Sequence, residues 1–192
     1  MRHWVLAHRP DGLPKGSDFR LERTSLPAPK DGEALIAVDF VSVDPGMRSR
    51  LSGDSYAAAL GLGETVESAG VGHVVESRSA RLPEGATVMG GFGWTTHAIS
   101  DGRGIQVLDP AIFSGRITPT ASIGVLGIPG LTAYFGLTDL GRPKAGETLL
   151  VSSAAGPVGA TAGQIGKKLG LTGLGSAGGP PKSGFGRDHL TG

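Results

Sequence analysis

The segment from Thr148 to Gly170, TLLVSSAAGPVGATAGQIGKKLG, constrains the fold of this chain more than any other stretch. A short apolar run leads into small residues and then into apolar residues at helical spacing, which predicts a strand, a tight turn and a helix. Within the turn, Ser153, Gly156 and Gly159 recur at every third position. Small residues there allow backbone N–H groups at the start of a helix to approach a phosphate. The spacing is S-x-x-G-x-x-G rather than G-x-G-x-x-G, so a turn that merely packs a helix closely on a strand is an equal alternative.

Upstream of this segment, the sequence predicts a β-rich domain over residues 1–118. Short runs of β-forming residues, such as HWVLA at 3–7 and ALIAVDFVSV at 34–43, alternate with turn signals such as DGLPKGSD and PAPKDGE. Strands at this spacing are typical of a barrel or a sandwich. The predicted fold class is therefore mixed α/β: a β-barrel domain at 1–118, followed by connecting helices, one strand and one helix over 119–170.

Residues 171–192 differ from the rest of the chain in composition. From Gly170 to Gly192, 8 of 23 residues are glycine and 2 are proline, so few side chains could form a core. Glycines also weaken the interior of a strand, which lowers the expectation of a strand in LTGLGS at 171–176. We expect this Gly/Pro-rich segment to be a disordered tail.

The overall composition argues against several classes of protein. A formal net charge of +1 provides no field that attracts nucleic acid or a membrane surface, and the absence of cysteine excludes disulfides and thiolate zinc sites. The five histidines are scattered along the chain, so we expect no metal site. No apolar run reaches the roughly 18 residues that cross a bilayer, and MRHWVLAHRPDG lacks the apolar centre of a signal peptide. We expect a cytoplasmic protein with no nucleic-acid or membrane partner.

Several motifs occur in an order and spacing that resemble one known family. They are VSVDPGMRSRL, GVGHVVES, GWTTHAISDG and the run from GIPGLTAYFG to GQIGKKLG. Over residues 1–170 the chain resembles the zinc-independent medium-chain dehydrogenase/reductase family, and within it the NADPH-dependent alkenal and alkenone reductases (the prostaglandin reductase or leukotriene B4 dehydrogenase group). The resemblance implies a GroES-like β-barrel domain joined to a Rossmann domain, and NADP as the cofactor. It also implies reduction of the C=C bond of a small-molecule α,β-unsaturated aldehyde or ketone.

The resemblance assigns the cofactor-binding residues. Gly156, Pro157, Val158 and Gly159 match the family's phosphate-binding turn, where Pro157 removes one N–H donor but suits the first position of a helix. A gapless continuation places Lys182 where the family binds the 2′-phosphate of NADPH. The alternative is that Lys182 is a solvated lysine in the tail. The resemblance assigns no catalytic residue on this chain.

One difference from the family concerns the substrate pocket. Gly46 stands in VDPGMR where the family has an aromatic hydroxyl that borders the substrate. Tyr56 lies nearby in the sequence and offers a phenol for the substrate pocket, whereas a lone tyrosine in a loop more often serves at the surface or in packing.

A second difference concerns the extent of the chain. The family continues through the remaining Rossmann strands, whereas this sequence stops at Gly192. We therefore expect a truncated product, a frame-shifted product or a fragment of a longer chain, inactive as an enal or enone reductase. Homodimerisation is an expectation only for a full-length chain. The rival hypothesis is a non-catalytic GroES-like fragment that binds no cofactor.

Overall fold

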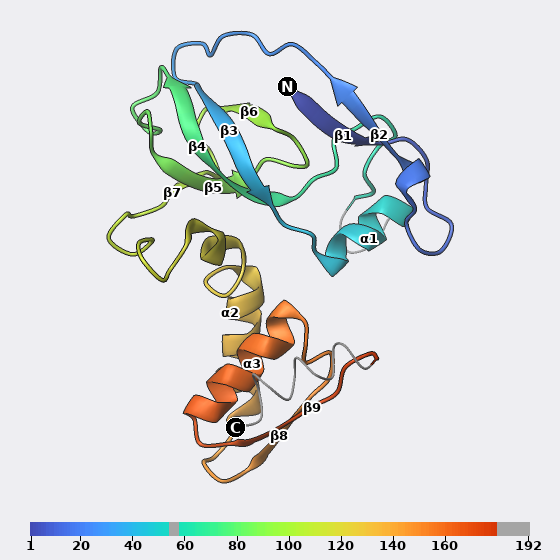
Figure 1. Cartoon of the computed structure of the whole chain (residues 1–192), viewed down its shortest axis with the longest axis vertical. Coiled ribbons are helices and arrows are strands. Elements are labelled where there is room, and N and C mark those ends of the chain that lie inside the picture. Colours follow the sequence, from blue (N-terminus) through green and yellow to red (C-terminus); the bar gives the residue numbers. More distant parts are fainter. Residues whose placement is uncertain (54–57, 180–192) are drawn as a thin grey trace. The chain divides into compact units, whose positions relative to one another are not determined.

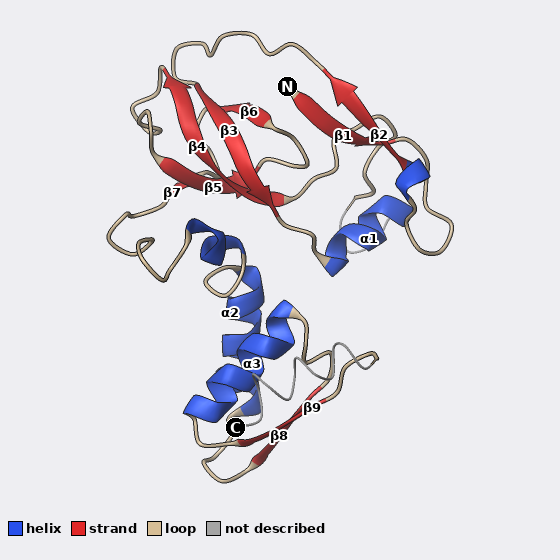
Figure 2. Ribbon diagram, in the orientation of Figure 1, coloured by secondary structure: helices blue, strands red, loops and turns tan. Residues whose placement is uncertain are grey.

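The computed structural model describes residues 1–53 and 58–179 (Figures 1 and 2). The chain divides into two compact units, Met1–Thr120 and Ala121–Gly192. The sequence predicts the end of the first unit at residue 118, close to the observed boundary after Thr120. Each unit is described by itself below.

The strands of the first unit pair in antiparallel fashion and are joined by long loops (Figure 2). Its strands are β1 (Arg2–Leu6), β2 (Phe19–Arg23), β3 (Ala34–Val41), β4 (Ala69–Ser77), β5 (Thr87–Gly91), β6 (His97–Ser100) and β7 (Gln106–Val107). Its helical elements are η1 (Gly16–Asp18), α1 (Pro45–Ser52) and the start of η2 (Pro119–Ile123). Strands β6-β3-β4-β5-β7 form one five-stranded sheet, and β1 pairs with β2 in a second sheet. The strands predicted from the sequence are confirmed, including the one that begins at Ala34.

Apart from its pairing with β2, strand β1 is attached to the rest of the first unit by isolated bridges rather than by a continuous ladder. His3 bridges to Thr95 and Val5 to Thr65. The Trp4 N–H donates to the Trp94 carbonyl at 2.9 Å, and the Trp4 carbonyl accepts from the Val66 N–H at 2.9 Å. Strand β1 is thereby held between two segments of the chain that belong to neither ladder, which gives the GroES-like barrel arrangement that was predicted.

Two apolar clusters fill the first unit. The first consists of Ala34, Ile36, Val74, Leu82 and Val88, all nearly or fully buried. The second consists of Leu6, Leu51, Leu60 and Val66, against which Phe19, Met47 and Trp94 pack. Alternating burial at the start of β3, where Ala34 and Ile36 are buried and Leu35 is not, is the period-2 pattern of a strand with one face in the core.

The second unit contains α2 (Ile128–Phe135), the π-helical turn η3 (Gly136–Gly141), β8 (Thr148–Val151), α3 (Pro157–Lys168) and β9 (Thr172–Gly175). Strands β8 and β9 are parallel, with Thr148 opposite Thr172 and Val151 opposite Gly175. Helices α2 and α3 pack against each other. The predicted strand and helix of the turn segment are confirmed. In the part of the chain that the structure describes, no helix is both long and apolar enough to span a bilayer.

The prediction of a disordered tail from residue 171 is wrong for its first residues, because β9 occupies Thr172–Gly175. Its ladder is made by backbone groups, so Gly173 and Gly175 can pair with β8 although they contribute no side chain. Leu171, directly before the strand, is 8% exposed and anchors it. The second unit thus has a strand, a helix and a second parallel strand, one strand more than the sequence predicts. Residues 180–192 of the expected tail lie outside the described residues.

We predict that Ile36→Ala destabilises the first unit by about 2–5 kcal/mol, because it leaves a cavity in a fully buried cluster. Val75→Ala is the control, since Val75 is 49% exposed on β4 and its loss should cost no more than about 1 kcal/mol. Urea unfolding followed by tryptophan fluorescence measures both, because the chain's two tryptophans, Trp4 and Trp94, lie in this unit. Equal losses in the two variants would contradict the assigned core.

Candidate nucleotide-binding site

The turn between β8 and α3 is fixed by its own backbone. After Val151, residues 152–156 form the turn, and α3 begins with Pro157 at its first position, where the missing N–H has no helical partner to lose. Ser153 has φ of 51°, in the left-handed region that a non-glycine residue rarely adopts. Its carbonyl accepts a hydrogen bond from the Gly156 N–H at 2.8 Å. The chain therefore reverses sharply and delivers the start of α3 beside the end of β8.

Gly159 brings the first turn of α3 against this backbone. A Cβ at position 159 would lie 2.6 Å from the Ser153 carbonyl oxygen and 2.7 Å from the Ala154 Cα. About two turns further along the same helix face, a Cβ at Gly166 would lie 2.6 Å from the Leu149 Cδ2. Any larger residue at 159 would push the helix off the turn. The close contact at Gly159 is therefore compatible with both interpretations of the turn, close packing of the helix and binding of a phosphate.

The start of α3 presents unpaired backbone donors. The first hydrogen bond into the helix runs from the Ala160 N–H to the Gly156 carbonyl at 2.8 Å. Among the described residues, the N–H groups of Val158 and Gly159 have no acceptor, as expected for the first turn of a helix. The helix dipole adds partial positive charge at this end. Ser153, Pro157 and Val158 are exposed, whereas Gly159 is buried, so the Val158 end of this helix terminus is open to an anion.

Strand β9 completes the edge at which this turn lies. The Ala154 N–H donates to the Ser176 carbonyl at 3.0 Å, and the Ser176 N–H donates to the Val151 carbonyl at 2.9 Å. Because β8 and β9 are parallel, the loops that follow them meet at the same edge, which is where ligands bind in open α/β sheets. Sequence reasoning missed this pair of hydrogen bonds, because nothing local to Ala154 specifies a partner at Ser176.

The structure brings together four of the six residues predicted for the sites. Gly156, Pro157, Val158 and Gly159 form the N-terminus of α3 and its preceding residue. Lys182 and Tyr56 lie outside the described residues.

Gly46 and the carboxylates of the first unit occupy structural positions. Gly46 lies in the first turn of α1, and its carbonyl accepts a hydrogen bond from the Ser49 hydroxyl at 2.8 Å. Asp44 precedes that helix and accepts from the Ser42 hydroxyl at 2.5 Å, while a Glu64 carboxylate oxygen accepts from the Gly61 N–H at 2.8 Å. No group of three or more potential metal ligands gathers anywhere in residues 1–53 and 58–179.

Comparison with known proteins agrees with this geometry. Residues 2–108 match the family described as the N-terminal domain of oxidoreductase. The chain is 44% identical over 182 residues to the NADPH-dependent curcumin reductase of Escherichia coli (strain K12), covering 94% of this chain and 52% of that protein. It is 42% identical over 179 residues to prostaglandin reductase 1 of Rattus norvegicus, covering 93% of this chain and 52% of that protein. The crystal structure of CurA in complex with NADPH from Vibrio vulnificus matches with a TM-score of 0.89 at 40% identity, covering 99% of this chain and 56% of that chain.

The fold and these matches together place the chain in the medium-chain dehydrogenase/reductase family. It belongs to the branch of that family that includes the curcumin and prostaglandin reductases matched above. It spans about half the length of the curated relatives it matches.

We predict that Gly159→Ala destabilises the second unit by roughly 1–3 kcal/mol, because the added methyl group has to displace backbone atoms of the turn. Gly136→Ala is the matched control: Gly136 has helical dihedral angles and open space at its Cβ position, so alanine should leave stability unchanged or raise it by up to about 1 kcal/mol. Amide hydrogen exchange of α3 in the two variants is the measurement. Unchanged protection of α3 in Gly159→Ala would show that the close approach is dispensable.

Proposed function

We propose that the turn between β8 and α3 binds the pyrophosphate of NADPH, and that the chain serves in reduction of the C=C bond of small α,β-unsaturated aldehydes or ketones. The observation that carries the proposal is the pair of unpaired N–H groups at Val158 and Gly159, held at the exposed N-terminus of α3. Membership of the reductase group and the NADPH-dependent relatives support the choice of cofactor.

The residues of the turn fit the pyrophosphate of NADPH. The N–H groups of Val158 and Gly159 would donate to pyrophosphate oxygens, and the absence of a Cβ at Gly159 leaves the helix close enough to the turn for both to point to one place. Pro157 contributes no donor, but it fixes the first residue of the helix. When bound, NADPH supplies the hydride for the reduction.

Two further residues enter the proposal, Lys182 through the family resemblance and Tyr56 through its position near Gly46 in the sequence. Lys182 would bind the 2′-phosphate that distinguishes NADPH from NADH, because it follows Gly159 at the distance where Rossmann enzymes contact the ribose. Tyr56 would place a phenol near the substrate in compensation for Gly46.

We further propose that these 192 residues by themselves turn over poorly. The donors of the turn would hold the pyrophosphate, while the hydride leaves from the nicotinamide ring at the other end of the cofactor. No described residue of the second unit is assigned to that ring. A reacting group misplaced by about 1 Å can lose on the order of a hundredfold in rate.

We predict that the chain binds NADPH and that Val158→Glu weakens this binding at least about tenfold. A carboxylate at this exposed position repels the pyrophosphate, yet it stabilises the helix by interacting with the dipole, so a loss of binding cannot be attributed to unfolding. Val75→Glu places the same charge on an exposed position of β4 and should leave the affinity unchanged. Titration calorimetry with NADPH measures the affinity of both variants. The same titration with NADH gives the preference between the two cofactors, which Lys182→Ala should reduce.

If the unmodified chain binds no NADPH while it is folded, the proposal is wrong. That result would favour the rival hypothesis of a non-catalytic GroES-like fragment. Equal weakening by Val158→Glu and Val75→Glu would place the nucleotide somewhere other than this turn.

We predict that NADPH oxidation by the 192-residue chain, with 2-nonenal as substrate, is at least about a hundredfold slower than that of a full-length reductase of the family measured in parallel. Appending the second half of that reductase to residue 179 should restore the rate. Turnover by the unmodified chain within a factor of a few of the full-length enzyme would refute the prediction.

A further inference from the structure

Strands β1 and β2 place two arginines and two apolar residues on one exposed face. Arg2 lies directly opposite Arg23, and Trp4 directly opposite Leu21. Partners across a strand pair share a face, and so do residues two apart along a strand. Trp4 is 42% and Leu21 44% exposed. One face of this strand pair, drawn in blue in Figure 1, therefore carries cations at one end and apolar side chains beside them.

This face borders an open groove of about 470 Å³, a volume in the range of small-molecule sites. Its lining residues come from β1, β2, the end of β3 and the segment before β6: Arg2, Trp4, Leu21, Val41, Trp94, Thr95 and Thr96. The Trp94 ring is held in place, because it packs on Phe19 with ring centroids 5.6 Å apart and its indole N–H donates to the Ser42 carbonyl at 3.4 Å. The groove thus has one rigid aromatic wall and one exposed tryptophan.

The positive charge beside the groove is not neutralised within the described part of the chain. Neither the Arg2 nor the Arg23 guanidinium has a hydrogen bond or an ion pair among those residues. The nearest acid in sequence, Glu22, lies on the opposite face of β2 and pairs with Arg20 at 2.6 Å. Like charges directly opposite each other in a strand pair are destabilising, so this edge favours a bound anion.

We propose that the groove binds a small organic carboxylate with a flat aromatic body. The Arg2 guanidinium, which lines the groove, would form charge-assisted hydrogen bonds with the carboxylate, and the ring would pack on Trp4 and Trp94. Arg23 lies directly opposite Arg2, outside the lining residues, and would add positive charge beside the carboxylate. This site is separate from the proposed NADPH function, because it contains no residue of the turn between β8 and α3.

The probe is 1-naphthoate, compared with the neutral 1-naphthalenemethanol. Because the chain's two tryptophans both line the groove, their two indole N–H resonances report on it directly. We expect 1-naphthoate to shift both resonances and to bind about three- to tenfold more tightly than the alcohol, the range expected for exposed charge-assisted hydrogen bonds.

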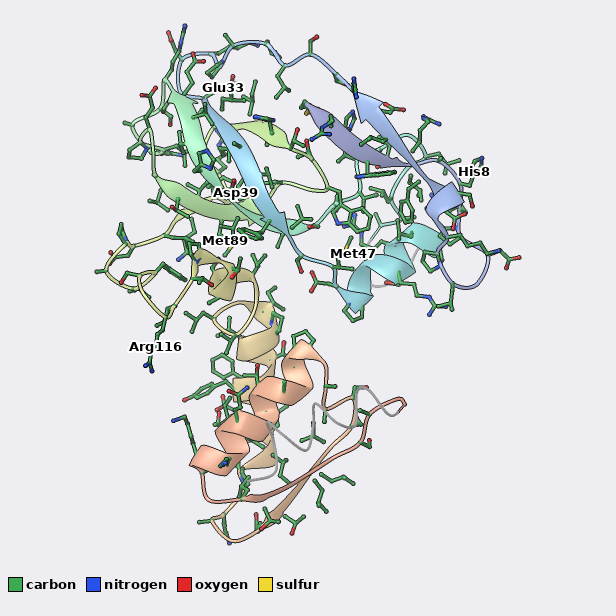
Figure 3. All side chains as sticks on the ribbon, viewed as in Figure 1. His8, Glu33, Asp39, Met47, Met89 and Arg116 are labelled. Atoms are coloured by element: carbon green, nitrogen blue, oxygen red, sulfur yellow. The ribbon has the colours of Figure 1, made fainter. Side chains whose placement is uncertain are left out.

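Variants separate binding from folding. Arg2→Gln and Arg23→Gln should each remove most of the preference for the carboxylate, while Arg116→Gln, at an exposed arginine in the loop after β7 (Figure 3), should leave it intact. Arg23→Glu sets opposite charges across the strands, so it should raise the stability of the first unit while abolishing the preference.

Three results would overturn the proposal. They are unshifted indole resonances, equal affinity for the carboxylate and the alcohol in the unmodified chain, and equal losses in Arg23→Gln and Arg116→Gln. Loss of binding in Arg23→Glu with an unchanged or raised melting temperature would support it, since an unfolded groove could not give that combination.

Discussion

The contact between the first turn of α3 and the backbone at Ser153 and Ala154 determines the geometry of the second unit. It exists because Gly159 has no Cβ, and it places the start of the helix at the end of β8. In the first turn of this helix, the N–H groups of Val158 and Gly159 have no acceptor among the described residues. Hydrogen bonds between Ala154, Ser176 and Val151 then hold the turn against the loop after β9. The close packing of the helix and the anion site that we propose therefore lie at the same turn of this unit.

The features that the sequence predicts well are those encoded within a few neighbouring residues. The strand, turn and helix from Thr148 to Lys168 follow from an apolar run, small residues and helical spacing, all within one segment. The strand at Ala34–Val41 follows in the same way from its β-forming residues. Strand β9 was missed because the intrinsic preference of glycine disfavours a strand. The strand is stabilised by its pairing with β8, which the local sequence does not reveal.

The groove of the first unit also could not be predicted from the sequence. It brings together Arg2, Leu21, Val41 and Trp94, which no local pattern relates. Its charge arrangement depends on the register that sets Arg2 opposite Arg23, and a shift by one residue would turn one of these side chains to the other face. Strand existence is a local property, but register depends on long-range contacts. The predictions for Tyr56 and Lys182 stay predictions, since both residues lie outside the described part of the chain.

The buried face of α3 limits how far the spacing between the helix and the turn can vary. Gly159, Gly163 and Gly166 are among its buried residues, so little of the face has rotatable side chains. Where Gly159 meets the turn, no rotamer exchange can alter the spacing between the backbones. Elsewhere in proteins, side chains absorb small changes in packing by hopping between rotamers. At this contact that freedom is missing, so the backbone alone sets where the N–H groups of Val158 and Gly159 lie.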